Sequence, residues 1–556
     1  LWKNMRARRY VQGGSTITQQ LMKNLFFTRQ KAISRKAKEI VFALVTEARH
    51  SKEAILEAYL NEVYFGQTAG LEIHGIAEAA RHYFDRPVTD LSLAESATLA
   101  AIVQLPEFYN PRKSPQRVFA RRNLVLKKML DAAFIEESEY RQATEAGLGI
   151  VPPERSLEDA NYFLDAVMRE LPESVKSQLD NGALAVYVTM DPKIQAVASR
   201  VLAFHIDRLQ KSVPILKKKA SAGIKLQGAM VAIDLKGCSI AALQGGQTYR
   251  QTQFNRVLSG HRQAGSLFKP FVYLAAFSRH DREFTPVTEM DDSPFEWSYE
   301  GQKWSPKNYD NQYRGKVTLR KALEESINVP TARLAQRVGL DQIIDVMVQA
   351  GIQSSLPKVP SIALGSADVT PLELAQAFST LANEGKHCPL RALNEVYDAN
   401  GNLLFQNKVE WTEKLDPAAT FQTIDLMKGV FISGTARSAR SSGIHLEHFA
   451  GKTGTTSEYK DAWFVGFSPS LLALVWVGYD EEEKVGLSGS AAALPIWIDF
   501  IKNIQTNVTD EDFPVPSGVT KLEIDTQTLK QASDHCPSKR VEYFAIGTEP
   551  PRCPQH

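Results

Sequence analysis

The stretch Ala264-Gly265-Ser266-Leu267-Phe268-Lys269-Pro270 decides how the second half of the chain is organised. Pro270 has no N–H to donate to the carbonyl four residues earlier, so we predict that a helix begins at or just before Ser266. At a helix N-terminus, unpaired N–H groups and the positive end of the helix dipole favour negative charge on a reacting oxygen. Lys269 follows on the same helix face, within reach of the Ser266 hydroxyl. Because a partly desolvated, neutral lysine can take a proton from serine near neutral pH, the pair is typical of an activated nucleophile.

Two motifs further along the chain strengthen this interpretation. An isolated Ser-x-x-Lys occurs roughly once or twice by chance in a chain of this length, usually as a surface lysine near a serine. Here it is followed by Ser326-Ile327-Asn328 and by Lys452-Thr453-Gly454-Thr455-Thr456. The order Ser-x-x-Lys, Ser-x-Asn, Lys-Thr-Gly resembles that of β-lactamases and penicillin-binding proteins. Ile327 replaces the aspartate of the β-lactamase motif, which is the penicillin-binding-protein pattern.

The three motifs supply the groups that acyl transfer needs. Ser326 would relay a proton between Lys269 and the leaving amine, and the Asn328 amide would orient the lysine and the substrate peptide. Lys452, expected on a strand that leads into the cleft, would supply positive charge for the terminal carboxylate of the donor peptide. Gly454 would let the substrate backbone approach the strand edge.

Backbone N–H groups complete the predicted site. Those of Ser266 and Thr455 would form an oxyanion hole, which typically contributes about 3 to 4 kcal/mol in such sites. The predicted catalytic residues are Ser266, Lys269, Ser326, Asn328, Lys452, Thr453, Gly454 and Thr455.

Length and composition limit the other possibilities. A chain of 556 residues is too long for one core, and its 43% hydrophobic and 23% charged residues are those of a globular protein. A net charge of +2 excludes a strongly basic nucleic-acid binder. The longest apolar runs are far short of the ~18 residues that a membrane span needs. Because the chain starts at Leu1 without an initiator Met and enters a motif almost at once, we expect that its N-terminus is cut.

The four cysteines predict one disulfide. Cys536 and Cys553 bracket a short loop rich in proline and polar residues, and a bond between them would imply an oxidising compartment. Cys238 and Cys388 stand alone in the sequence and are interpreted as buried apolar residues. Neither cysteines nor histidines show the spacing of a metal site.

Residues 1–150 are predicted to be an all-α lobe. Ile40, Val41, Leu44, Val45 and Ala48 form one apolar stripe at helical spacing. Ser51 is placed to cap the next helix, and an apolar helix is expected before Pro106.

Three segments of this lobe carry a second resemblance. They are Gly13-Gly14-Ser15-Thr16-Ile17-Thr18-Gln19-Gln20-Leu21-Met22-Lys23-Asn24, Arg35-Lys36-Ala37-Lys38-Glu39 and Lys52 to Asn61. Taken alone, Arg35 and Glu39 are an ordinary i,i+4 ion pair. Together the segments resemble the family 51 peptidoglycan glycosyltransferases, the lysozyme-like lobe that polymerises lipid II in class A penicillin-binding proteins. The resemblance implies that lipid II phosphates and sugars contact Gly14, Ser15, Thr16, Gln20, Lys23, Arg35 and Lys36, with Glu39 beside the transferring sugar.

One motif of that family is absent from the sequence. A Glu-Asp pair followed by a His and a Gly, which carries the catalytic base, should precede Gly13. We therefore expect that this lobe binds its substrates but does not polymerise them. The resemblance implies no cofactor for transpeptidation and leaves open a divalent cation such as Mg²⁺ for the glycosyltransferase lobe.

The rest of the chain is predicted to contain three further regions. Residues 151–225 are interpreted as a linker that docks two lobes, 226–505 as the transpeptidase domain and 506–556 as a C-terminal extension. Strand pairs are expected at Ala229 to Ile233 with Ser239 to Leu243, and at Ala462 to Phe467 with Leu471 to Val477. Strands at both ends with helices between them predict an α+β lobe. The resemblance implies a five-stranded antiparallel sheet flanked by helices, as in β-lactamases and DD-peptidases.

The resemblance extends over nearly the whole chain. Trp304-Ser305-Pro306-Lys307-Asn308 and Asn328-Val329-Pro330-Thr331 are similar to class A penicillin-binding proteins, closest to the 1B type. This implies D-Ala-D-Ala transpeptidation between stem peptides, with β-lactams as inhibitors. It also implies a location on the periplasmic face of the bacterial inner membrane, an anchor upstream of this chain, and activator, divisome or elongasome proteins as candidate partners.

Two other functions remain open. A DD-carboxypeptidase or β-lactamase would use water as acceptor, but we find no Glu-x-x-Leu-Asn pattern between Asn328 and Lys452 to activate it. A non-enzymatic scaffold or penicillin sensor that kept the fold is disfavoured for the second lobe by the three intact motifs, but the missing first motif leaves it open for the first lobe.

Overall fold

The structure is a computed structural model in which the chain divides into two compact units, Leu1–Leu157 and Glu158–His556. The residues that it describes are 15–26, 33–68, 71–151, 156–179, 184–481, 483–505, 508–509 and 511–554.

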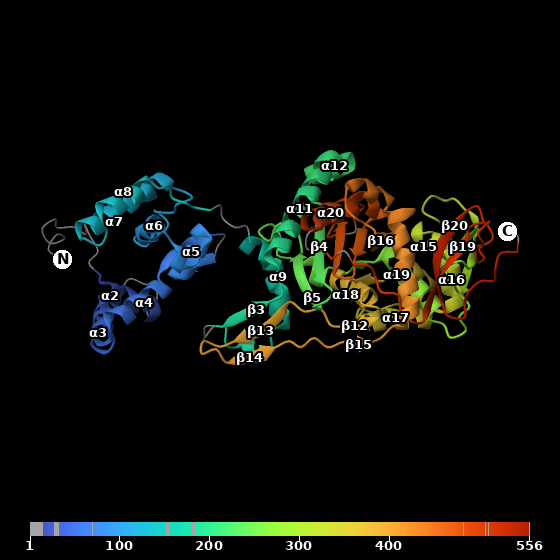
Figure 1. The fold of residues 1–556 in the computed structure, drawn as a ribbon, viewed down its shortest axis with the longest axis horizontal. Helices are drawn as coiled ribbons and strands as arrows, with labels where there is room; N and C mark the ends of the chain where they lie inside the picture. Colours follow the sequence, from blue (N-terminus) through green and yellow to red (C-terminus); the bar gives the residue numbers. More distant parts are fainter. Residues whose placement is uncertain are drawn as a thin grey trace. The chain divides into compact units, whose positions relative to one another are not determined.

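Unit 1 is helical, as predicted, and is drawn in blue to cyan in Figure 1. It also contains a short hairpin, which the sequence did not predict. Ser51 caps α4 by accepting a hydrogen bond from Ala54 N, as expected. The elements are α2 (Ile17–Phe26), α3 (Ile33–Arg49), α4 (Lys52–Glu62), β1 (Tyr64–Thr68), β2 (Leu71–His74), α5 (Ile76–Phe84), η1 (Val88–Asp90), α6 (Leu93–Ile102), α7 (Pro115–Asp131) and α8 (Glu137–Glu145).

The apolar stripe predicted on α3 does not face the core of this unit. Val41 and Leu44 are 57% and 66% exposed, whereas Ala43 is buried. The periodicity therefore identified the helix correctly, but it did not identify the face that packs. No described helix combines the length and the apolar composition that a bilayer crossing requires.

A five-stranded sheet forms the centre of unit 2. Its strands lie in the order β16-β17-β18-β4-β5, and every neighbouring pair is antiparallel. Both predicted strand pairs are present. The bounds are β4 (Gln227–Asp234), β5 (Ser239–Gln244), β16 (Ala450–Thr455), β17 (Ala462–Phe467) and β18 (Leu471–Gly478).

Both faces of this sheet are buried, because alternate residues of each strand enter different cores. One face, with Trp463 and Trp476, packs in the larger core with α14 and α18. The other face, with Phe464 and Val475, packs against α11 and α20, which lie side by side (Figure 1). Burial on both sides explains why these strands are almost continuously apolar.

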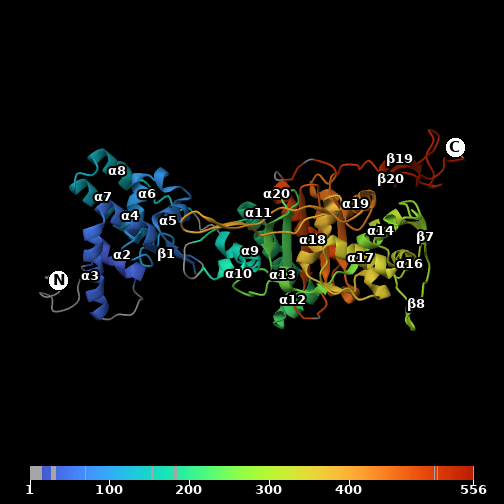
Figure 2. The same ribbon diagram turned by 90° about the horizontal axis from the view of Figure 1, so that it is seen from below.

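The helices and short strands of unit 2 surround this sheet, and Figure 2 shows them from below. The helices are α9 (Ser156–Glu170), α10 (Glu173–Lys176), α11 (Pro192–Ser212), α12 (Pro214–Ser221), α13 (Arg256–Ser259), η2 (Gly265–Phe268), α14 (Lys269–Phe277), α15 (Leu319–Glu324), α16 (Asn328–Val338), α17 (Leu340–Ala350), η3 (Pro360–Leu364), α18 (Pro371–Ala382), α19 (Pro417–Ile432), η4 (Arg437–Ser442), η5 (Ser457–Tyr459) and α20 (Gly489–Ile504). The outer strands are β3 (Ala185–Val188), β6 (Arg262–Gln263), β7 (Glu289–Asp292), β8 (Trp297–Tyr299), β9 (Gln302–Trp304), β10 (Gly315–Thr318), β11 (Asp368–Val369), β12 (Lys386–His387), β13 (Leu393–Tyr397), β14 (Leu403–Gln406), β15 (Thr412–Glu413), β19 (Val519–Asp525) and β20 (Lys539–Ala545).

The segment interpreted from sequence as a linker, 151–225, is largely part of unit 2. β3 pairs with β13 in a three-stranded sheet. Gln195 on α11 accepts from Leu243 N (2.8 Å) and donates to Leu243 O (3.2 Å). α11 packs on the sheet, so the junction between the two lobes lies before this helix. The chain divides into its two units near residue 157.

The disulfide prediction was wrong. Cys238 and Cys388 form the disulfide, with Cα atoms 6.1 Å apart and 150 residues apart in sequence. Cys536 and Cys553 are both buried thiols, and their sulfur atoms lie within 4.8 Å of each other and of an Asp525 carboxylate oxygen.

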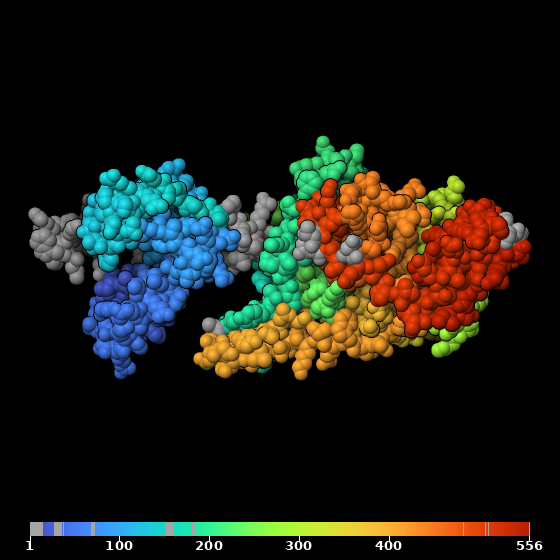
Figure 3. All heavy atoms as spheres, in the orientation of Figure 1, coloured from blue at the N-terminus to red at the C-terminus, as the bar shows by residue number. Residues whose placement is uncertain are grey.

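The C-terminal hairpin β19–β20 is fastened to the rest of unit 2 by buried charges. Arg320 on α15 forms ion pairs with Glu542 (2.5 Å) on β20 and with Asp425 on α19. Glu324, at the end of α15, pairs with Arg540 of the same hairpin and accepts a hydrogen bond from Ser433 Oγ (2.6 Å). Figure 3 shows the end of the chain, in red, as one block on the surface of unit 2. These ion pairs tie the last strand to the helix that precedes Ser326.

Candidate active site

Ser266 lies in the 3₁₀ turn η2, so a helical segment begins just before Ser266, as predicted, with its first turn of the 3₁₀ type. The α-helix, α14, begins at Lys269 with Pro270 in its first turn. In a 3₁₀ helix the side chains of residues i and i+3 are eclipsed, so the turn places the Lys269 side chain alongside that of Ser266. Gly265 has φ = +54°, and a Cβ there would meet Thr455 O at 2.8 Å, so only glycine fits at this position. The turn therefore packs directly against the end of β16.

Ser326 lies in a strained turn between α15 and α16. Its φ is +56°, a left-handed conformation that non-glycine residues rarely adopt. Hydrogen bonds from Ser326 N to Leu323 O (3.1 Å) and from Ile327 N to Ala322 O (2.8 Å) close the turn. The conformation points the Ser326 carbonyl at Lys269, whose Nζ lies 2.6 Å from it.

Lys269 is fully buried and has only polar neutral partners. Its Nζ donates to Ser326 O (2.6 Å) and Asn328 Oδ1 (2.7 Å), and lies 3.3 Å from Ser326 Oγ. Burial, and next the charge of Lys452, lower the pKa of Lys269 well below its usual value of 10.5. No carboxylate is among these contacts, so the neutral amine is the favoured form.

Lys452 extends from β16, at the edge of the sheet, to the same serine. Its Nζ donates to Ser326 Oγ (2.8 Å) and to Thr453 O (2.9 Å). Burial lowers the pKa of Lys452 to about 7. Ser326 Oγ therefore lies between two lysine amines, which is the position a proton relay needs.

The end of β16 faces the nucleophile turn. Thr455 O lies next to Gly265, and because the N–H and C=O of a strand residue point to the same side, Thr455 N–H also points toward η2. A Cβ on Gly454 would meet Leu267 Cγ at 2.9 Å. Glycine at position 454 therefore allows the η2 turn to pack closely against β16. The sequence had suggested a different reason for this glycine, the approach of the substrate backbone.

The cleft in front of these groups has a volume of about 610 Å³. Gly265, Asn328 and Thr456 line it, as do Trp304 at the end of β9 and Lys307 in the segment that follows. The structure thus brings together all eight residues predicted to be catalytic: the Ser266 turn, the Ser326 turn and the end of β16 meet at one cleft.

Unit 1 brings together part of its predicted binding surface. Lys36 Nζ donates to Ser15 Oγ (2.7 Å) and to Glu39 Oε2 (2.9 Å). Gln19, which the sequence did not single out, lies 3.5 Å from the same amine, whereas Gln20 is turned toward Tyr59. Thr16 Oγ1 accepts from Gln19 N at the start of α2, and Lys23 is exposed. Gly14 and the side chain of Arg35 lie outside the described residues.

Two residues near the second site were also missed. Asn308 binds the backbone at the start of α16, and Thr435 lies 2.7 Å from Thr453, hydroxyl to hydroxyl. Neither has a local sequence signal for this role, because each acts on a segment distant in the chain.

Comparison with known proteins agrees with this architecture. Three family models match: "Transglycosylase" at residues 1–130, "Penicillin binding protein transpeptidase domain" at 228–497, and "Penicillin-binding protein 1A, C-terminal domain" at 515–553. Penicillin-binding protein 1A of Aquifex aeolicus is 35% identical, over 98% of this chain and 84% of that protein. The chain belongs to the class A penicillin-binding proteins.

Other members of the family align over most of the chain. Penicillin-binding protein 1B of Vibrio cholerae is 37% identical over 94% of this chain and 66% of its own length. The crystal structure of penicillin-binding protein 1A from Haemophilus influenzae superposes with a TM-score of 0.63 at 25% identity, covering 92% of this chain and 93% of that one. This penicillin-binding protein therefore combines a peptidoglycan glycosyltransferase domain with a transpeptidase domain, the bifunctional arrangement of the class.

Proposed function

We propose that unit 2 is a serine D-Ala-D-Ala transpeptidase that cross-links stem peptides through an acyl-enzyme on Ser266. The observation that carries the proposal is the buried Lys269 amine, whose short hydrogen bonds run to neutral acceptors, Ser326 O and Asn328 Oδ1. These contacts occupy both N–H bonds of a neutral amine. Its lone pair is then left to exchange a proton with a serine hydroxyl.

The proposed reaction follows from this arrangement. Ser266 Oγ attacks the carbonyl carbon between the two D-Ala residues while its proton passes to Lys269 Nζ. The oxyanion is held by the N–H groups of Ser266 and Thr455, and collapse breaks the C–N bond as Lys269 returns the proton through Ser326 to the leaving D-Ala. A stem-peptide amine then attacks the ester carbonyl and loses a proton to Lys269, which returns it to Ser266 Oγ as the ester C–O bond breaks.

The first prediction is that the acyl-enzyme formed with a penicillin persists. No carboxylate of the described residues is a hydrogen-bond partner of Lys269 or Ser326, so a water beside these two residues would lack a carboxylate base to activate it against the ester. Incubation with a fluorescent penicillin should give a covalent label that survives denaturation, with the added mass on the peptide containing Ser266. Rapid turnover of the penicillin would instead support the hydrolase, and absence of labelling would support a non-enzymatic scaffold.

The second prediction concerns Lys452 and pH. Because burial places its pKa at about 7, its positive charge is present below that pH and is lost above it. Affinity for ligands with a carboxylate should therefore fall about tenfold per pH unit above the pKa of the free protein. Acylation rates measured from pH 5 to 9 test this.

A matched ligand serves as the control for this prediction. With a peptide whose terminal carboxylate is amidated, the fall in acylation rate above the Lys452 pKa should disappear. The Lys452→Met variant should lose the same fall when it is tested with the carboxylate ligand. If the fall at high pH is identical for both ligands, Lys452 does not bind the carboxylate.

The ligands of unit 1 and the location of the protein are also proposals. Lipid II and nascent glycan strands are the proposed ligands of unit 1, and the expectation that residues 1–556 do not polymerise them stays a prediction. We also propose a periplasmic location, which the Cys238–Cys388 disulfide supports, since such bonds persist in oxidising compartments. Membrane attachment, activator partners and an Mg²⁺ requirement of unit 1 stay predictions.

A further inference from the structure

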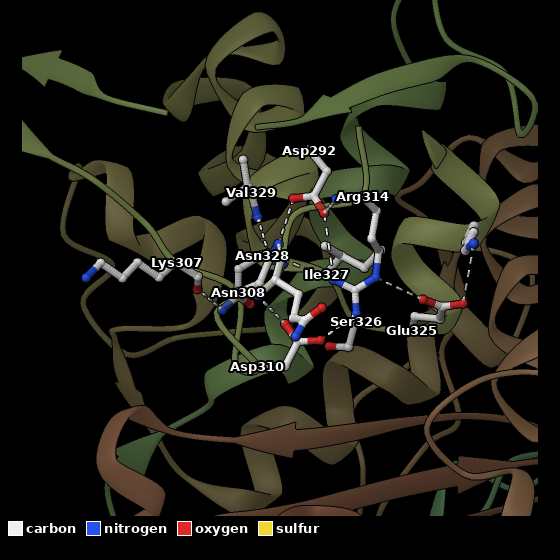
Figure 4. A network of polar contacts seen from close by, with 12 residues as sticks. Asp292, Lys307, Asn308, Asp310, Arg314, Glu325, Ser326, Ile327, Asn328 and Val329 are labelled. Atoms are coloured by element: carbon white, nitrogen blue, oxygen red, sulfur yellow. Dashed lines mark hydrogen bonds and ion pairs between the residues drawn. The ribbon is translucent and has the colours of Figure 1, made fainter. Parts of the chain in front are cut away.

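The N-terminus of α16, where Asn328 lies, is capped by a residue from another segment. Its own N-cap residue, Ile327, provides no side-chain hydrogen bond. Instead Asn308 Oδ1 accepts from Asn328 N (3.0 Å) and Val329 N (3.1 Å), as Figure 4 shows. Free N–H groups at a helix start are normally bound by the residue immediately before the helix. Here the cap fixes the position of the Asn328 backbone from twenty residues away.

The Asn308 amide is itself held in one orientation. Its Nδ2 donates to Asp292 Oδ1 (2.7 Å) and to Gln312 O (2.7 Å). The other Asp292 oxygen accepts from Arg314 N (3.0 Å), and Asp292 is fully buried. The oxygen of the Asn308 amide thus accepts two hydrogen bonds and its nitrogen donates two. If the amide were flipped, its NH₂ group would face the backbone N–H groups of Asn328 and Val329.

The neighbouring residue fixes the amide of Asn328 in the same way. Lys307 O accepts from Asn328 Nδ2 (2.7 Å), which leaves Asn328 Oδ1 facing Lys269 Nζ (2.7 Å). If this amide were reversed, Nδ2 would donate to the lone pair of the lysine amine. The orientation of one amide therefore decides whether the amine can act as a base.

We propose that Asn308 is a positioning residue for Lys269: the Lys307–Asn308 segment holds Asn328 so that its oxygen, not its nitrogen, meets the amine. This inference rests on the proposed function and extends it to residues outside the three motifs. Among described residues, the charged group that acts on Lys269 is Lys452 from β16, and the Ser326 turn and α16 contribute neutral partners.

The third prediction is that Asn308→Leu slows acylation by about 10- to 100-fold, because it displaces the residue that positions the general base. Affinity before acylation should change much less than the rate. The acid midpoint, which is the pH of half-maximal acylation rate on the acidic side of the profile, should also move to lower pH. The reason is that protonated Lys269 loses the Asn328 oxygen as a hydrogen-bond acceptor. Stopped-flow measurement with a penicillin from pH 4 to 9 separates affinity from rate. The control is Tyr309→Leu, the next residue, whose side chain is 69% exposed; it should match the wild type.

A second variant guards against simple misfolding. Asn308→Asp combined with Asp292→Asn exchanges the amide and the carboxylate, restoring both the cap and the hydrogen bond between positions 292 and 308. It should recover part of the lost rate, because Gln312 O then faces a carboxylate oxygen and no longer a donor. If Asn308→Leu does not fold, Asn308→Ser, which is too short to bridge Asp292 and α16, should show the same shift of the acid midpoint.

Two results would overturn the inference. One is an unchanged acid midpoint with a rate that falls only in proportion to the folded fraction, measured by thermal unfolding. The other is a wild-type rate in Asn308→Leu. Failure of the proposed function is distinguishable from both, because the wild-type protein would then form no adduct on Ser266.

Discussion

Replacing Ser266 by alanine is expected to abolish covalent capture of β-lactams and the release of D-Ala from stem peptides, with a loss of at least about 10⁴-fold. The change removes only the attacking oxygen, because the η2 turn is closed by backbone contacts such as Gly265 N to Gly365 O (3.0 Å). The folded state should therefore be retained. Gel fluorescence after labelling with a penicillin, followed by mass spectrometry of the intact protein, measures the effect.

The control for this variant is another serine of the same cleft. Ser361 lines the cleft, and its hydroxyl lies 3.0 Å from that of Ser366. Ser361→Ala should label at the wild-type rate. Undiminished labelling of Ser266→Ala would place the nucleophile elsewhere and end the proposed mechanism.

Replacing Lys269 by methionine should lower the acylation rate by about 10²- to 10⁴-fold, the usual contribution of a general base. Methionine is close to lysine in length and apolar, so it fills the buried space. It leaves Ser326 O and Asn328 Oδ1 without a donor, a cost of about 1 to 3 kcal/mol each, partly offset by no longer burying an amine. Stopped-flow acylation at pH 7 and thermal unfolding together separate the two effects.

The pH profile gives the sharper test of this variant. In the wild type, the rate should rise as Lys269 loses its proton at a pH well below 10.5. Lys269→Met should lack this rise, whereas Lys303→Met, which removes an exposed lysine on β9, should keep it. An identical pH dependence in Lys269→Met would mean that another group takes the proton from Ser266.

The parts of the fold that depend on neighbouring residues could be predicted from the sequence. The continuous apolar run at Ala229 to Ile233 and the Ser51 cap of α4 are local signals, and both appear in the structure. The three catalytic motifs were recognisable because each is short and their order is specific. That the three motifs lie at one cleft was predicted from the resemblance to penicillin-binding proteins, not from the residues themselves.

The features that were missed depend on contacts between distant segments. Cys238 and Cys388 are 150 residues apart, and no pattern around either one indicates the other. The α3 stripe has helical periodicity whether or not another surface covers it. Asn308 looks like an ordinary loop residue until α16 is placed against it.

The buried charges beneath the Ser326 turn have a consequence for how this protein is made. Residues 540 and 542 are synthesised 216 and 222 residues after Glu324 and Arg320, whose partners they supply on the helix that presents Ser326. A nascent chain ending before residue 540 would contain every catalytic motif, but Glu324 would lack Arg540, and Arg320 would lack Glu542 while keeping Asp425 and Glu324. Full support of the Ser326 turn is thus coupled to synthesis of the β19–β20 hairpin.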